Sequence, residues 1–249
     1  MKQSFWVKTY DVNTIVLNSQ KRLGLTGLLN LLQDIAWLHA EHLGWGYEDL
    51  IKRNTIWVLV RQKLIMTRWP AWGEAVTIRT WPRGVAGALA LRDFAIMTDE
   101  DKVGECTTSW LTLDWQTRRP QKIDPSTFIL QDRPPGLSFE AEKIAVRNDL
   151  KPAAKFQVRY SDLDVNGHVN NTRYAQWILD AASADEIATL ELVDYEVNFL
   201  AETRIGDEIV LERGDIERPA SGPAWCHFQG RRAADNKAVF AAKLSARRR

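Results

Sequence analysis

Apolar residues in the first third of the chain recur at the spacing of an amphipathic helix. The stripe consists of Leu28, Leu31, Leu32, Ile35, Leu38 and Leu43. It predicts a helix that opens near Thr26 and ends at Gly44. Because Leu29, Ala36 and Trp37 lie off this stripe and are also apolar, the helix is expected to be surrounded by other structure.

Segments with strand character flank this helix. A short extended segment over residues 6–17 precedes it, and strands are expected after it at residues 56–67, 76–81, 88–98 and 104–116. One long helix followed by consecutive antiparallel strands predicts an α+β fold in which a sheet curls around a helix.

The second part of the chain repeats this order of elements. A helix is expected at residues 171–184, and strands at residues 194–200, 224–232 and 238–243. Residues 205–209 correspond to residues 72–76, each at the head of a strand. Such a duplication predicts two similar units that pair as a pseudo-dimer.

Sequence without clear periodicity separates the two units. It contains Pro120, Pro125, Pro134, Pro135 and Pro152, as is typical of a segment between domains. We therefore expect an N-terminal domain at residues 1–135, a linker at 136–154 and a C-terminal domain at 155–249.

A polar cluster precedes the second helix. Asp164, Asn166 and His168 are spaced two apart, so in an extended segment their side chains project to one side. Asn170 or Asn171 then supplies an N-cap. A helix start offers unpaired N–H groups and a positive dipole end, which suit a substrate oxygen that becomes negative during reaction.

The first unit has no counterpart of this cluster. Residues 22–27, where its helix begins, hold nothing suited to moving a proton. We therefore expect one unit to react and the other to shape a pocket. Nine of the eleven tryptophans lie between Trp6 and Trp115, where they either build the core and the seam between units or line a long apolar pocket.

Composition and charge exclude several classes of function. The 33 basic and 32 acidic side chains nearly cancel, which gives no global attraction to nucleic acid or to an anionic membrane. Neither a targeting leader nor a membrane-spanning stretch is visible. We therefore expect a cytoplasmic protein.

Cysteines and histidines do not form a metal-binding pattern. Cys106 and Cys226 are far apart and are expected to be buried free thiols. His39 and His42 share a helix face but lack a third ligand nearby. No metal and no cofactor are expected.

Residues 162–171, followed by Tyr174 and Trp177, resemble the signature of the plant-type acyl-ACP thioesterases. Matches in the first unit are Ile56, Trp57, Val58, Arg61, Pro70, Trp72, Gly73, Glu74, Trp81, Arg92, Asp93, Trp110, Asp114 and residues 117–120 and 122–123. The resemblance covers essentially the full length and implies two tandem hotdog domains, each an antiparallel sheet wrapped around a long central helix. Plant members carry a plastid leader that this chain lacks, so a bacterial relative is expected.

This resemblance implies hydrolysis of the thioester between a fatty acyl chain and the phosphopantetheine arm of acyl carrier protein, as in fatty acid biosynthesis. In the family, an Asp, an Asn and a His of the motif act with a Glu from the following strand. These residues correspond to Asp164, Asn166, His168 and Glu202. Plant members place a cysteine directly after that glutamate, whereas this chain has Thr203, which makes a cysteine mechanism unexpected.

Without a thiol nucleophile, we expect an activated water to attack the thioester carbonyl. Glu202 is the candidate general base, and His168 is the second candidate. Backbone N–H groups around Val169 and Asn170 are expected to face the developing oxyanion. Asn166 donates to the carbonyl or holds the water, and Asp164 orients His168 or Asn166.

Other interpretations stay open at this point. Asp162 and Asp164 are common in turns, and Asn170 and Asn171 suit structural caps. The same fold could instead hydrolyse acyl-CoA, act as a hydratase or dehydratase, or bind acyl thioesters without catalysis. A homodimer and the preferred acyl chain are likewise left open.

Overall fold

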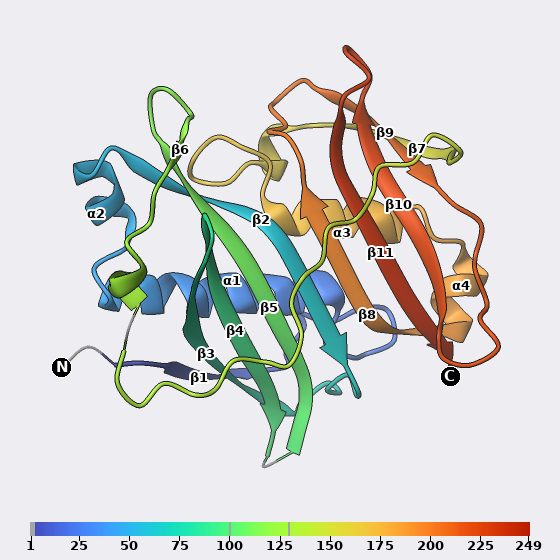
Figure 1. Ribbon diagram of the computed structural model, residues 1–249. Helices are drawn as coiled ribbons and strands as arrows, with labels where there is room; N and C mark the ends of the chain where they lie inside the picture. Colours follow the sequence, from blue (N-terminus) through green and yellow to red (C-terminus); the bar gives the residue numbers. More distant parts are fainter. Residues whose placement is uncertain (1–2, 100, 129) are drawn as a thin grey trace. The chain divides into compact units, whose positions relative to one another are not determined.

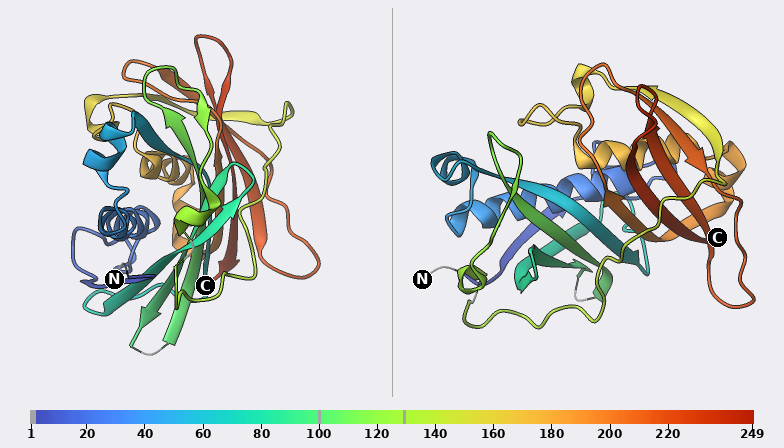
Figure 2. Two further views of the ribbon diagram at one scale, coloured as in Figure 1. Left: turned by 60° about the vertical axis from the view of Figure 1, so that its left-hand side comes forward. Right: turned by 45° about the horizontal axis from the view of Figure 1, so that its top comes forward.

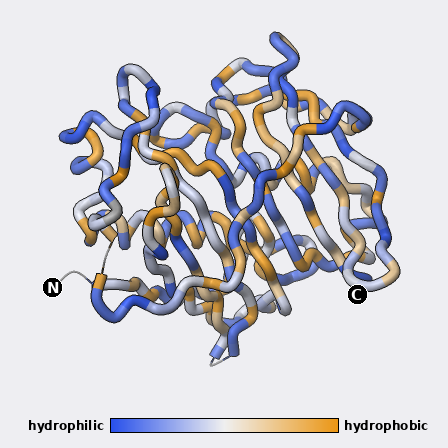
Figure 3. Tube along the Cα trace, in the orientation of Figure 1, coloured by the Kyte–Doolittle hydropathy of each residue, from blue (hydrophilic) through white to orange (hydrophobic). Residues whose placement is uncertain are grey.

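The computed structural model describes residues 3–99, 101–128 and 130–249 (Figure 1). The chain divides into two compact units, Met1–Ala141 and Glu142–Arg249. Within each unit, strand segments alternate between hydrophobic and hydrophilic positions (Figure 3). This pattern is expected of sheets that bury one face.

Unit 1 consists of an antiparallel sheet with one long helix. Its elements are β1 (Trp6–Asp11), α1 (Leu25–His42), α2 (Tyr47–Lys52), β2 (Thr55–Met66), β3 (Ala75–Ala86), β4 (Leu89–Thr98), β5 (Asp101–Asp114), β6 (Pro120–Gln121) and the 3-10 helix η1 (Pro125–Phe128). The strands pair in the order β1-β3-β4-β5-β2, and β6 adds to β5.

Helix α1 lies across one face of this sheet (Figures 1 and 2). Leu28, Leu32 and Ile35 on the helix are at most 1% exposed, as are Ile78 and Phe94 of the sheet. Burial of such side chains contributes about 1.5 to 3 kcal/mol each. The predicted helix is confirmed to within two residues at each end. Its stripe is confirmed in part, since Leu31 and Leu38 are only half-buried and Leu43 follows the last residue of the helix.

A buried histidine on α1 bridges the N-terminal segment and the sheet. His39 Nε2 is 3.1 Å from the Gln3 carbonyl oxygen, and its Nδ1 is 3.1 Å from Arg92 Nη1. Burial and the nearby Arg92 cation lower the pKa of His39 to about 4. A neutral ring that donates from Nε2 and accepts at Nδ1 satisfies both contacts.

Unit 2 repeats the strand order with different lengths. Its elements are β7 (Lys151–Gln157), the 3-10 helix η2 (Tyr160–Asp162), α3 (Asn171–Asp180), α4 (Ala184–Thr189), β8 (Leu190–Phe199), β9 (Glu208–Arg213), β10 (Ala224–Arg232) and β11 (Ala238–Arg248). The order β7-β9-β10-β11-β8 matches that of unit 1 strand for strand, apart from β6. The helices in each unit lie between its first and second strands.

Aromatic rings fix α3 against its sheet. Tyr174 makes edge contacts with Phe199 on β8 and Phe240 on β11, with ring centroids 5.3 and 5.2 Å apart. Trp177 stacks on Phe156 of β7 at 5.7 Å. These contacts determine where the N-terminus of α3, and the polar cluster before it, lie in unit 2.

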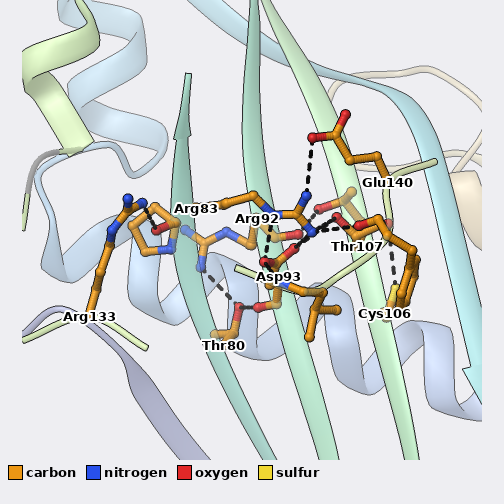
Figure 4. Close-up of polar contacts among 12 residues, drawn as sticks. Thr80, Arg83, Arg92, Asp93, Cys106, Thr107, Arg133 and Glu140 are labelled. Carbon is orange, nitrogen blue, oxygen red and sulfur yellow. Dashed lines mark hydrogen bonds and ion pairs between the residues drawn. The ribbon is translucent and has the colours of Figure 1, made fainter. Parts of the chain in front are cut away.

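An irregular stretch, residues 133–149, connects the units and is called the connecting segment here. In unit 1 its main chain is bound by the ion pair of Arg83 and Asp93 (Figure 4). Asp93 accepts the Leu137 N–H at 3.0 Å, and Arg83 donates to the Phe139 carbonyl at 2.8 Å. Asp93 is fully buried and also accepts from the Thr107 hydroxyl at 2.8 Å.

Buried polar side chains of unit 2 bind the rest of this segment in the same way. Asn198 accepts the Ile144 N–H at 2.8 Å and donates to the Glu142 carbonyl at 2.9 Å. Gln229 accepts the Arg147 N–H at 3.0 Å and donates to the Arg147 carbonyl at 2.7 Å. Side chains therefore satisfy the main-chain polar groups of Leu137, Phe139, Glu142, Ile144 and Arg147 although the segment forms no strand.

Several predicted elements have different bounds. The first strand ends at Asp11 rather than at residue 17, and α2 was not predicted. The helix expected at 171–184 ends at Asp180, because Ser183 begins α4 with a capping box to Glu186. Strand β7 starts at Lys151, within the stretch expected as linker.

Candidate active site

Residues 163–170, here called the motif loop, are shaped by Asp164. Its Oδ1 accepts the N–H groups of Asn166 and His168 at 2.8 and 3.2 Å. The Asp164 N–H donates to the His168 carbonyl at 2.8 Å, and Gly167 takes φ +74° to close the turn. Aspartate fits this turn because its short side chain can bond nearby backbone N–H groups.

The motif loop leads directly into α3. Asn170 is the N-cap, and its Oδ1 accepts both the N–H and the hydroxyl of Thr172 at 3.0 Å. The Asn170 N–H donates to the Asp162 carbonyl at 2.8 Å. Asn170 therefore acts as a structural cap, one of the two roles that the sequence left open.

Glu202 and Thr203 follow β8 and lie beside the motif loop. The Thr203 carbonyl accepts the Val169 N–H at 3.2 Å. Its hydroxyl, buried with the rest of the side chain, accepts a hydrogen bond from Tyr174 of α3 at 3.0 Å. Burial raises the pKa of Tyr174 to about 12, so its hydroxyl stays protonated and can donate.

These contacts bring His168 and Glu202 together. His168 Nε2 is 3.6 Å from Glu202 Oε2, and the side chains are 20% and 31% exposed. Arg204 Nη2 contacts the same carboxylate oxygen at 3.2 Å. An imidazole beside a partly buried carboxylate can move a proton, which is the chemistry that general base catalysis requires.

A pocket opens beside Glu202. It has a volume of about 340 Å³ and is lined by Ala201, Glu202, Arg204, Arg232 and Lys237. Arg232 is held by Asp207 and Asp235 at 3.5 and 3.1 Å. The pocket places solvent-accessible space directly against the candidate carboxylate.

The backbone N–H groups of Val169 and Asn170, expected to face the oxyanion, already have hydrogen-bond acceptors. Both the Val169 N–H and the Asn170 N–H already donate to carbonyl oxygens within unit 2, those of Thr203 and Asp162. Stabilising an oxyanion requires a donor aimed at the place where negative charge develops. These two groups instead hold the motif loop in place.

The Asp164 carboxylate also has a structural role. It accepts the backbone N–H groups of Asn166 and His168. It therefore places His168 by shaping the main chain. Arg204 was missed by the sequence analysis, and its position two residues after Glu202 was the available signal.

Neither cysteine is placed to serve as the nucleophile. Cys106 belongs to unit 1, where burial raises the pKa of its thiol to about 12. Cys226 lies on β10 and donates to the Gly214 carbonyl at 3.3 Å, and burial raises the pKa of this thiol as well. A thiol becomes reactive when its pKa is lowered, so both environments favour inert thiols.

In the part of the chain that the structure describes, no three His, Cys, Asp or Glu side chains gather as metal ligands would. The same residues include no helix that is long and apolar enough to cross a bilayer.

The sequence matches two family profiles. The profile of the acyl-ACP thioesterase N-terminal domain matches residues 2–129, and that of the C-terminal domain matches residues 147–224. The motif loop and its helix lie within the second match.

Curated relatives include plant enzymes of this family. A chloroplastic palmitoyl-acyl carrier protein thioesterase of Cuphea hookeriana is 27% identical over 92% of this chain and 57% of its own length. A chloroplastic oleoyl-acyl carrier protein thioesterase of Coriandrum sativum is 27% identical over 84% of this chain and 60% of its own. This chain thus spans about three fifths of these relatives.

Solved structures agree along the whole chain. An acyl-ACP thioesterase from Bacteroides thetaiotaomicron superimposes with a TM-score of 0.86 at 26% identity and covers 98% of both chains. The 12:0-ACP thioesterase from Umbellularia californica gives a TM-score of 0.88 at 19% identity, over 100% of this chain and 96% of the other; this second likeness concerns the fold alone. From the two profile matches together with the motif loop, the chain belongs to the acyl-ACP thioesterase family.

Proposed function

We propose that this protein hydrolyses the thioester of a fatty acyl chain carried by acyl carrier protein, releasing the fatty acid and the free carrier thiol. The observation that carries the proposal is the pair formed by His168 on the motif loop and Glu202 after β8, 3.6 Å apart within the matched C-terminal domain. The relatives named above act on acyl carrier protein thioesters, which supports the same class of substrate.

Glu202 is the proposed general base. It removes a proton from a water molecule in the adjacent pocket as the water oxygen attacks the thioester carbonyl carbon. The tetrahedral intermediate then expels the carrier sulfur, which takes up the proton. A thiolate is a good leaving group, and a positioned base contributes about 10² to 10⁴ in rate.

Asn166 is the proposed donor to the oxyanion, since the Val169 and Asn170 N–H groups are engaged elsewhere. Its amide can donate two hydrogen bonds, and it lies on the motif loop two residues before His168. His168 is hydrogen-bonding partner to the water or to Glu202, and it is the second candidate for the base.

We also propose that the chain consists of two tandem hotdog domains. The equal strand order of the units supports this arrangement, in which unit 1 shapes the acyl pocket and unit 2, whose first strand begins at Lys151, catalyses. We place this activity in fatty acid biosynthesis in the cytoplasm. The proposal is compatible with a monomer and with a homodimer.

The test is a thiol-release assay over acyl-carrier-protein and acyl-CoA substrates with matched acyl chains. We expect thiol release to be faster from acyl carrier protein than from acyl-CoA. Salt should slow the reaction of the carrier protein more, because this carrier is acidic and salt screens its charge attraction to the enzyme. His168→Ala and Glu202→Gln should each stay folded and lose about 10² to 10⁴ in rate.

Each other outcome has a definite meaning. An equal or higher kcat/KM for acyl-CoA would assign the chain to acyl-CoA hydrolysis. Tight acyl-thioester binding without thiol release by the wild type would refute the hydrolase proposal and indicate a binding protein. A folded variant with near wild-type rate would remove that residue from the mechanism.

A further inference from the structure

Arg204 contacts the candidate base more closely than His168 does. Its Nη2 lies 3.2 Å from Glu202 Oε2, and His168 Nε2 lies 3.6 Å from the same oxygen. The arginine contact lies at the long limit of an N–H···O hydrogen bond, whereas the histidine contact is longer than such a bond.

An ordered turn holds the main chain of Arg204. Its N–H donates to Asp207 Oδ2 at 2.9 Å, and its carbonyl accepts the Asp207 N–H at 3.1 Å. Asp207 is in turn 3.5 Å from Arg232 Nη1. The Arg204 side chain is 66% exposed, and its guanidinium extends from this ordered turn to the Glu202 carboxylate.

Glu202 needs such a restraint. It lies in the irregular stretch after β8 ends at Phe199, and its side chain is 31% exposed. A glutamate side chain there can adopt several rotamers. A rotamer that turns the Glu202 carboxylate away from His168 also takes the general base out of its reactive position.

We propose that Arg204 is a positioning residue, which holds the Glu202 carboxylate at the edge of the pocket and beside His168. This inference rests on the proposed hydrolase function. Arg204 acts through Glu202, so it affects the rate of the chemical step more than substrate binding.

The kinetic test compares Arg204→Gln with Arg204→Lys. Exposed ion pairs are weak, so we expect Arg204→Gln to lower kcat by about three- to tenfold with little change in KM. Lysine keeps the charge but not the planar fork, so Arg204→Lys should restore part of the rate. Arg218→Gln removes an exposed cation elsewhere in unit 2 and serves as the matched control.

A second measurement does not depend on activity. The chain has four histidines, so the ring signals of His168 can be assigned by substitution and followed by NMR. Arg204→Gln and Glu202→Gln should both shift the His168 ring signals, and Arg218→Gln should leave them in place.

An unchanged kcat in Arg204→Gln would overturn the proposal. A higher kcat would overturn it as well, because it would mean that Arg204 holds Glu202 in a position that slows the reaction. Unshifted His168 signals in Arg204→Gln would overturn it as well. If the wild type releases no thiol from any substrate, the hydrolase function fails, and the NMR comparison still decides whether Arg204 positions Glu202 against His168.

Discussion

The hydroxyl of Tyr174 donates a 3.0 Å hydrogen bond to the hydroxyl of Thr203, the residue that follows Glu202. The two side chains are 5% and 1% exposed. The bond therefore joins helix α3 to the segment that carries the candidate base, on the side of that segment away from solvent. The position that holds a cysteine in plant members thus has a structural role here.

Removing this bond should affect both stability and rate. Tyr174→Phe and Thr203→Val should each lower the free energy of unfolding by about 1 to 2 kcal/mol, since one buried hydroxyl loses its partner. The kcat for thiol release should fall because Glu202 is held less firmly. Urea denaturation and a double-mutant cycle check this, and additive effects of the two substitutions would contradict a direct coupling.

Two substitutions of Asp164 separate the effect of its hydrogen-bond-accepting oxygen from the effect of its negative charge. Asn keeps an oxygen that can accept the N–H groups of residues 166 and 168, so Asp164→Asn should keep the motif loop and most of the activity. Asp164→Ala leaves both groups without this acceptor and should cost about 1 to 3 kcal/mol. Equal losses of thiol release in the two variants would show that the charge itself is required.

His39 should make stability fall with acid. In the unfolded chain, His39 binds a proton once the pH falls below its ordinary pKa of about 6.5. In the folded protein, burial and the Arg92 cation lower the pKa of His39 to about 4. The unfolded state thus binds more protons between these values, and stability should drop by as much as about 3 kcal/mol as the pH falls from 6.5 to 4. Below that range this contribution changes no further.

Denaturant unfolding across this pH range measures the effect. His39→Gln removes the titrating group, so the slope of stability against pH between 4 and 6.5 should become shallower than in the wild type. A variant with the wild-type slope would show that other groups cause the acid dependence.

The ion pair of Arg83 and Asp93 should contribute strongly to the stability of unit 1. Asp93→Asn leaves a mostly buried guanidinium without its carboxylate, which should cost about 3 to 5 kcal/mol. Glu140→Gln is the matched control, because it removes the other carboxylate near Arg83. The Glu140 side chain is 62% exposed. The cost of Glu140→Gln should stay below about 1 kcal/mol. Urea midpoints of the two variants provide the comparison.

Periodicity was sufficient for the long elements, because their residues repeat a pattern over many turns or strand positions. The stripe from Leu28 to Leu43 predicted α1 closely, and the strand at 224–232 has the predicted bounds. Short elements were missed. Helix α2 has six residues, too few for a helical period to appear, and α4 was merged with α3 although Ser183 and Glu186 form a capping box.

The candidate site was predictable in its residue types but not in its hydrogen bonds. The spacing predicted that Asp164, Asn166 and His168 project to one side of an extended segment. The structure instead folds residues 164–167 into a turn and brings Glu202 to that loop. The sequence could not show that the Val169 N–H would be taken by the carbonyl of Thr203, which lies far along the chain. Such pairing depends on which strand end lies beside the loop in the folded protein, and the sequence of the loop alone does not determine this.

The connecting segment is bound through its main chain at Leu137, Phe139, Ile144 and Arg147, so these bonds place little selection on the identity of those side chains. Residues such as Ile144 and Arg147 contribute N–H groups that almost any amino acid supplies, whereas Asn198 and Gln229 must keep their amides. Among diverging relatives, this stretch should therefore accumulate substitutions faster than the sheet residues beneath it, with proline at an N–H donor position as the change least tolerated.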